Sequence, residues 1–149
     1  MAELDYDGFD DAKVAHLNLI QGIVNRLEGN AFALKAMSIT LAAVVMAFVG
    51  STGSTNMLVS FVACLPVIMF WLMEARYIQL GRYFRSLFDA VRRGQVAEPF
   101  SMDFGPYVGH EQGIARIALS WSVCWFYLTI LAALAAVAIV VQRVGSFAA

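Results

Sequence analysis

The longest apolar stretch of this chain reads IALSWSVCWFYLTILAALAAVAIVV (Ile117–Val141), and no charged side chain interrupts it. Two other uncharged apolar stretches precede it, at Ala36–Val49 and Met57–Met73. A chain of 149 residues has no interior large enough to hide all three stretches from water. The sequence therefore predicts an all-α integral membrane helical bundle with three transmembrane helices.

The composition favours the same class. Hydrophobic residues make up 60% of the chain and charged residues 14%, whereas a soluble domain is roughly half apolar and about a quarter charged. The formal net charge of −1 argues against a nucleic-acid partner. Cys64 and Cys124 both lie in apolar stretches, where cysteine behaves as a small hydrophobe, so neither a disulfide nor a metal site is expected.

The first predicted part, residues 1–30, combines an acidic tail with an amphipathic cytosolic helix. Apolar residues recur at spacings of three and four between Val14 and Leu27, and polar residues occupy the other face. Gly29-Asn30 is a stop or kink signal, so the first transmembrane helix is expected at residues 31–50. The short uncharged turn that follows predicts an antiparallel hairpin with a second span at residues 56–75.

The helical pattern continues beyond the second span, in which Pro66 is expected to introduce a kink. Apolar residues keep helical spacing from Tyr77 to Val91, which predicts a long cytosolic extension at residues 76–94 that stops at Gly94. The rest of a single membrane domain (1–149) is expected to be a connector at residues 95–113, a third span at residues 114–142 and a tail at residues 143–149.

Basic residues gather at one end of the predicted bundle. Lys35 precedes the first span, and a series of arginines from Arg76 to Arg93 follows the second, whereas the hairpin turn carries no basic residue. The positive-inside rule places the basic side in the cytoplasm. We therefore expect the N-terminus to be cytoplasmic and the C-terminus to be outside.

Glu74 lies where the second span meets the cytosolic extension, at the same predicted membrane surface as Lys35. Its carboxylate either neutralises Lys35 across the hairpin or rings a cation pore in an oligomer, and pairing is favoured because an unpaired charge at that depth is costly. The arginine face either only enforces topology, which is favoured, or holds anionic lipid headgroups, a nucleic acid or a protein partner. The candidate interface or gating residues are Lys35, Glu74, Arg76, Tyr77, Arg82, Arg85 and Arg93.

The apolar stripes of the two predicted cytosolic helices and the alanine-rich half of the third span are each expected to pack against another surface. The apolar stripes of residues 14–27 and 77–91 are expected to pack on each other, on a neighbouring subunit or on the membrane, and mutual packing is favoured. The second half of the third span is rich in alanine, and small side chains let helices approach closely in lipid, which predicts a homo-oligomer. The alternative is that alanine is present simply as a good helix former.

Catalytic and cofactor-binding patterns are not found in the sequence. A metal site needs three or more ligands at fixed spacing, and the two histidines, His16 and His110, lie far apart. We therefore expect no catalytic residue, no cofactor and no metal, and the chain is not expected to be an enzyme. Hydroxyl groups inside the spans, such as those of Ser38 and Thr129, can bond to the preceding helical turn.

The segment HLNLIQGIVNRLEGNAFALK (His16–Lys35) resembles the opening of a group of small uncharacterised bacterial three-span membrane proteins with a pattern like IQxxIxRLxxNxFxLK. The segment FWLMEARY (Phe70–Tyr77), followed by Arg82 and Arg85, is similar to their second-span exit. This resemblance implies the bacterial inner (cytoplasmic) membrane as the location. More loosely, the topology resembles that of SLATT-like proteins of bacterial conflict systems, which are proposed as membrane-disrupting effectors.

Two functional hypotheses follow. In the first, the protein is an oligomeric pore-forming or membrane-perturbing effector that is gated by its cytosolic helices, with membrane lipids and copies of itself as partners. In the alternative, it is a non-enzymatic membrane anchor or accessory subunit that docks a soluble cytosolic protein.

Overall fold

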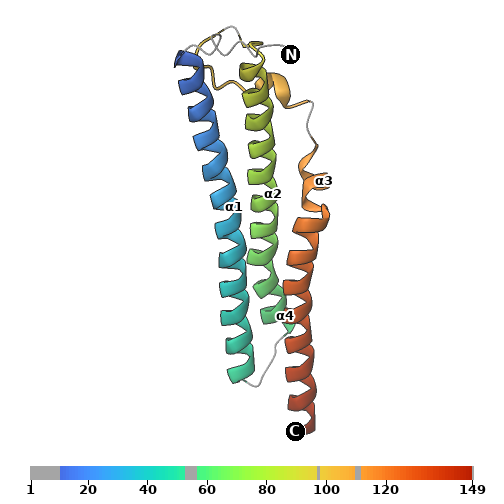
Figure 1. Ribbon diagram of the computed structural model, residues 1–149. Coiled ribbons are helices and arrows are strands. Elements are labelled where there is room, and N and C mark those ends of the chain that lie inside the picture. Colours follow the sequence, from blue (N-terminus) through green and yellow to red (C-terminus); the bar gives the residue numbers. More distant parts are fainter. Residues whose placement is uncertain (1–10, 53–56, 97, 110–111, 149) are drawn as a thin grey trace, which may run out of the picture.

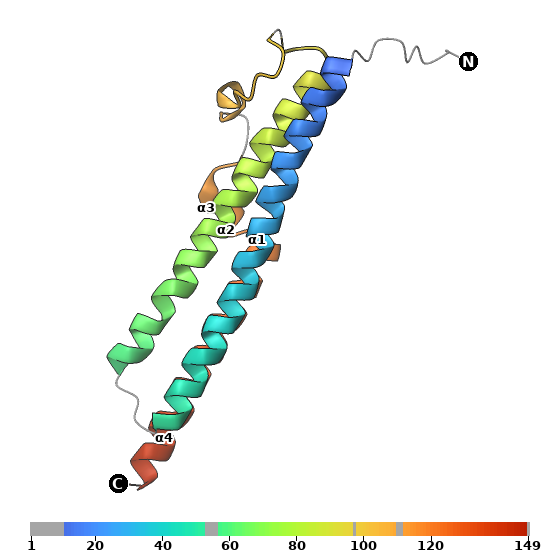
Figure 2. The same ribbon diagram turned by 90° about the vertical axis from the view of Figure 1, so that its left-hand side faces the viewer.

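The computed structural model consists of long helices that lie side by side (Figure 1). It describes residues 11–52, 57–96, 98–109 and 112–148; the predicted acidic tail at residues 1–10, the middle of the hairpin turn, and His110 with Glu111 lie outside the described residues. Helix α1 (Asp11–Thr52) and helix α2 (Met57–Arg92) form an antiparallel hairpin, and helix α4 (Trp121–Ala148) packs along one half of it (Figures 1 and 2). The described ranges contain no strand, which confirms the all-α fold class.

Helix α1 is one continuous helix of 42 residues, so the stop predicted at Gly29-Asn30 is wrong. Glycine in a helix interior costs only about 1 kcal/mol relative to alanine. Packing outweighs this cost, because α1 buries a stripe at helical spacing on both sides of Gly29, formed by Ile20, Val24, Ala31, Leu34 and Ser38. The amphipathic segment and the first apolar stretch are therefore a single element.

Helix α2 joins the second apolar stretch to the arginine-rich segment without a break, and Pro66 lies inside it. It ends at Arg92, and Gly94 follows with a φ of 69°, a left-handed conformation that glycine adopts without strain. The amide of Gln95 donates to the carbonyl oxygen of Ala90 at 2.9 Å, as in a Schellman turn. The stop predicted at Gly94 is confirmed.

The third apolar stretch is divided into helix α3 (Ile114–Ala118) and α4, whereas the sequence predicts one span at residues 114–142. At the break, the indole Nε1–H of Trp71 donates to the carbonyl oxygen of Ala118 at 2.9 Å. This bond gives a partner to a carbonyl oxygen at the end of a helix, which permits an interruption in apolar surroundings. Helix α4 also continues through the predicted tail as far as Ala148.

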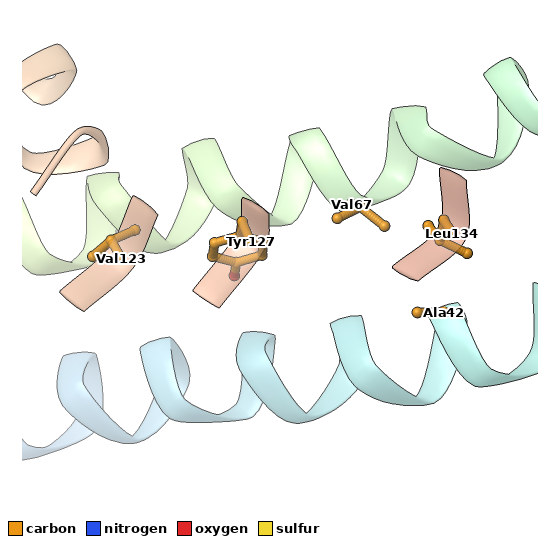
Figure 3. Packing of buried hydrophobic residues seen from close by; sticks show 5 residues of the cluster. All are labelled: Ala42, Val67, Val123, Tyr127 and Leu134. Carbon is orange, nitrogen blue, oxygen red and sulfur yellow. The ribbon is translucent and has the colours of Figure 1, made fainter. Parts of the chain in front are cut away.

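The hairpin has one hydrophobic core toward each end. The name basic end is used here for residues 11–30 of α1, residues 77–92 of α2 and the connector. At the basic end the two predicted apolar stripes pack on each other, which confirms their mutual packing. The buried residues of this core are Ile20, Val24, Leu87 and Val91. We term residues 36–52 of α1, 57–73 of α2 and α4 the apolar end. Its core is formed by α1, α2 and α4 together, through Ala42, Val67, Val123, Tyr127 and Leu134 (Figure 3).

The surface of the apolar end is itself apolar. In the described part of the chain, α1 and α4 are the two helices long and apolar enough to cross a membrane, and only 22% and 17% of their apolar windows are buried inside the protein. Large side chains such as Val44, Phe48 and Val140 are more than half exposed. Extended apolar surface of this kind suits contact with lipid rather than with water. The side chains of residues 57–63 lie outside the described residues, so the span in α2 stays a prediction.

Candidate functional site

A buried carboxylate lies where the basic end meets the apolar end. Glu74 directly follows the second apolar stretch of the chain, Met57–Met73, which forms the first half of α2. Its side chain is buried, and the residue is only 1% exposed. It lies seven residues, about two helical turns, after the equally buried Val67, so both side chains share the face of α2 that points into the bundle. A carboxylate at this depth needs partners, because burying an unpaired charge is costly.

Lys35 of α1 supplies the opposite charge. Its Nζ atom lies 3.1 Å from Oε1 of Glu74, as the favoured prediction from the sequence requires. The same ammonium group lies 5.3 Å from the ring centroid of Phe126 of α4, within the range of a cation–π contact. The Lys35 side chain is 29% exposed, so it reaches the buried carboxylate while keeping access to the surface.

Tyr127 of α4 binds the second carboxylate oxygen. Its hydroxyl group donates to Oε2 of Glu74 at 2.9 Å, and its side chain is fully buried. The ring lies between α1 and α2 (Figure 3) and stacks on the indole of Trp71, with the centroids 5.8 Å apart. The hydroxyl of Ser38, on the buried face of α1, donates to the carbonyl oxygen of Leu34 at 2.7 Å.

Glu74, Lys35 and Tyr127 together form what we term the Glu74 cluster. Each oxygen of the carboxylate is bound by a different helix, so the cluster fixes the register of α1 and of α4 on α2. Both oxygens have a partner within one chain, as pairing across the hairpin requires. The cluster therefore acts as a structural connection among the helices.

A groove of about 330 Å³ opens beside the Glu74 cluster, between α1 and α2. Apolar side chains and charged side chains contribute to its lining, which consists of Leu27, Glu28, Ala31, Phe32, Lys35, Glu74, Tyr77, Ile78, Gly81, Arg82 and Arg85. Three of these side chains are cationic and two are carboxylates. The groove thus occupies the boundary between the apolar end and the basic end.

The two arginines of the groove differ in their partners. Arg85 forms an ion pair with Glu28 of α1 across the groove, and both side chains are more than half exposed. Arg82 donates to the side-chain oxygen of Gln112 at 3.1 Å, and no carboxylate of the described residues lies within ion-pair distance of it. Arg82 therefore carries a positive charge that the described part of the chain does not neutralise.

Two of the predicted site residues lie elsewhere. Arg76 donates to the side-chain oxygen of Gln79, whose amide group donates to the backbone oxygen of Gln112 at 3.2 Å. Arg76 therefore helps to hold the connector and does not line the groove. Arg93 is exposed beyond the end of α2, apart from the cluster and the groove. The structure brings together the remaining predicted residues, Lys35, Glu74, Tyr77, Arg82 and Arg85.

Sequence reasoning missed two residues that join distant segments. Tyr127 could have been noticed as a hydroxyl-bearing ring in the middle of an apolar stretch, because such a hydroxyl needs a partner. His16 is 4% exposed, and its Nε2–H donates to the backbone oxygen of Ser101 at 2.9 Å, so it attaches the connector to α1. Nothing in the sequence near His16 indicates this long-range contact.

Within the described ranges, no three His, Cys, Asp or Glu side chains come together in a group that could hold a metal ion. Comparisons with protein-family models, with curated proteins and with solved structures found no match. A functional proposal therefore rests on the Glu74 cluster, on the groove and on the exposed surfaces of the helices.

Proposed function

We propose that this protein crosses the bacterial cytoplasmic membrane three times and acts there as a self-associating, membrane-perturbing effector whose basic end controls its activity. In this topology the N-terminus and the basic end are cytoplasmic, and the C-terminus is outside. The exposed apolar surface of α1 and α4 supports the membrane location, and the arginines at one end support the orientation. The apolar half of α2, at residues 57–73, supplies the second of the three spans.

The alanine surface of α4 is the observation that carries self-association. Helix α4 packs within the chain through Val123, Tyr127 and Leu134, whereas four alanines of its second half are exposed, namely Ala132, Ala133, Ala135 and Ala136. Small side chains let a second helix approach closely, and van der Waals contact then favours association in lipid. Because side chains fill the core of the apolar end, a conduit for ions has to form between copies of the chain.

Control by the basic end is supported by the continuity of the helices. Helices α1 and α2 pass from the basic end into the apolar end without interruption. A partner that shifts these helices at the basic end therefore also shifts them where they face lipid.

Native mass spectrometry and dye release from liposomes test this proposal together. The wild-type protein is expected to be oligomeric and to release the dye. Ala132→Leu/Ala136→Leu enlarges two side chains that share one helix face, so we expect a lower oligomeric mass and weaker release. Ile139→Leu/Val140→Leu is the matched control, because both of these side chains are already large and exposed. A wild-type protein that is monomeric in lipid nanodiscs and leaves liposomes tight would refute the proposal.

An accessory subunit that docks a soluble protein is the second candidate, and exposed apolar side chains at the basic end favour it. Val14, Leu19 and Val108 are each more than 40% exposed at that end. This function predicts tight liposomes together with a co-purifying soluble protein. Leu19→Glu is expected to release that protein, whereas Asn18→Glu at the adjacent exposed position is expected to retain it.

A further inference from the structure

We infer that the groove between α1 and α2 is a binding site for one anionic phospholipid, with the headgroup phosphate bound by Arg82. The inference rests on the membrane location in the proposed function, and it is independent of pore formation. Charge, depth in the membrane and shape each support it.

The charge of the groove fits a phosphodiester. Within the part of the groove lining that the structure describes, Lys35 is paired with Glu74 and Arg85 with Glu28, so one positive charge remains in excess, and it lies on Arg82. Among the described residues, Arg82 has the neutral amide of Gln112 as its hydrogen-bond partner. A phosphodiester carries one negative charge and would neutralise the excess. A guanidinium group also presents a planar set of donors that suits phosphate oxygens.

The position of the groove fits a lipid rather than a soluble anion. The groove begins at Lys35 and Glu74, directly after the uncharged stretch of α2, where headgroups are expected. Phe32 lines it and is 76% exposed, and Ile39 lies two turns further along the same face of α1, where it is 54% exposed. An apolar surface therefore leads from the groove toward the lipid-facing part of α1. Tyr77 adds an aromatic ring of the kind that is enriched at membrane interfaces.

The shape of the groove offers a direct way to block it. About 330 Å³ is at the small end of the range of ligand sites, so the groove can hold a headgroup while the acyl chains lie outside it. Gly81 forms part of the wall, and a Cβ atom added there would meet no atom within 4 Å. A larger side chain at position 81 would therefore start in open space at the groove wall and extend into the groove.

Isothermal titration calorimetry on the purified full chain in detergent tests the site with three probes: short-chain phosphatidylglycerol, short-chain phosphatidylcholine and inorganic phosphate. We expect one phosphatidylglycerol per chain, bound about tenfold more tightly than phosphatidylcholine, because phosphatidylglycerol has a net negative charge, whereas the choline cation of phosphatidylcholine cancels the charge of its phosphate. Arg82→Gln is expected to lower the affinity for phosphatidylglycerol about tenfold, because it removes the positive charge that the headgroup would neutralise. Gly81→Leu is expected to abolish binding. Gly22→Leu is the control for the glycine-to-leucine change itself, because Gly22 is an exposed helical glycine of α1 outside the groove, and a Cβ atom added there would also meet no atom within 4 Å.

Three outcomes would overturn the site. Equal affinity for the two lipids would exclude a headgroup charge site, and wild-type binding by Gly81→Leu would place the lipid elsewhere. Binding of inorganic phosphate as tight as that of phosphatidylglycerol would assign the groove to a soluble anion. If Gly81→Leu does not fold, the affinity of Arg82→Gln for phosphatidylglycerol still tests the site. None of these readouts depends on oligomeric mass or dye release, so this site and the proposed function can fail separately.

Discussion

The basic end and the apolar end both contain parts of α1 and α2, and two pairs of apolar side chains on α2 show how the ends differ. At the basic end, Leu87 and Val91 of α2 are at most 5% exposed. At the apolar end, Leu72 and Met69 of the same helix are 50% and 60% exposed. Water requires apolar side chains to be covered, whereas lipid tails do not. In the proposed topology this change along α2 corresponds to two surroundings, water and lipid, with the boundary near Glu74.

Charged groups show the reverse arrangement. At the basic end, ion pairs such as Glu28–Arg85 and Asp89–Arg92 lie at the surface. At the boundary, Glu74 is buried, and both of its oxygens are bound. Removing one partner should therefore have a large effect at the boundary and a small effect at the basic end.

Breaking the Glu74 cluster is expected to produce the largest loss of stability. Lys35→Met leaves the carboxylate of Glu74 buried without a counter-charge, which typically costs about 3–5 kcal/mol. Glu74→Gln is expected to cost less, because Lys35 is partly exposed and the amide oxygen can still accept from Tyr127. The double variant Lys35→Met/Glu74→Gln should be more stable than the sum of the two losses predicts. Denaturant unfolding in detergent measures all three, and simple additivity would show that the two side chains are not coupled.

Truncating leucines on α2 sharpens the contrast between its two halves. Leu87→Ala removes a buried side chain from the core of the basic end, and we expect a loss of about 2–5 kcal/mol. Leu72→Ala at the exposed surface of the apolar end serves as the comparison, with an expected loss below about 1 kcal/mol. The same unfolding experiment ranks the two variants. A larger loss for Leu72→Ala would mean that another chain or helix covers that surface.

Removing the ion pair across the groove should have the smallest effect. Arg85 and Glu28 are both more than half exposed, and pairs of this kind contribute roughly 0.2–1 kcal/mol. Glu28→Gln should therefore lower stability only slightly, and the difference from wild type should disappear at high salt, because salt screens exposed charges. A loss that persists at about 1 M salt would show that the pair is shielded from solvent.

The sequence was sufficient for features that depend on local chemistry. Gly94 ends α2 because glycine accepts the left-handed conformation that closes a helix, and such signals can be read directly. The pairing of Lys35 with Glu74 was also predictable, because two opposite charges at one membrane surface of a hairpin need each other. Similarly, Thr129 donates to the carbonyl oxygen of Trp125 at 2.7 Å, on the preceding turn, as its position in an apolar helix requires.

Features set by tertiary contacts could not be predicted in this way. Gly29 signals a helix end, but packing of α1 on α2 continues past it and decides the outcome. The break after Ala118 depends on an indole donor forty-seven positions earlier in the chain, Trp71, which no local pattern reveals. Tyr127 could be recognised as needing a partner, but the face on which α4 meets Glu74 is decided by packing among the three helices.

The uninterrupted length of α1 has a mechanical consequence. At about 1.5 Å per residue its 42 residues extend for about 63 Å, roughly twice the thickness of the hydrocarbon layer. In the proposed topology the headgroup plane crosses α1 near Lys35, not far from the midpoint of the helix. This crossing point acts as a pivot for the helix. A sideways displacement of the cytoplasmic part of α1 therefore moves the part within the membrane in the opposite direction, because α1 is continuous and has no hinge that would take up the movement.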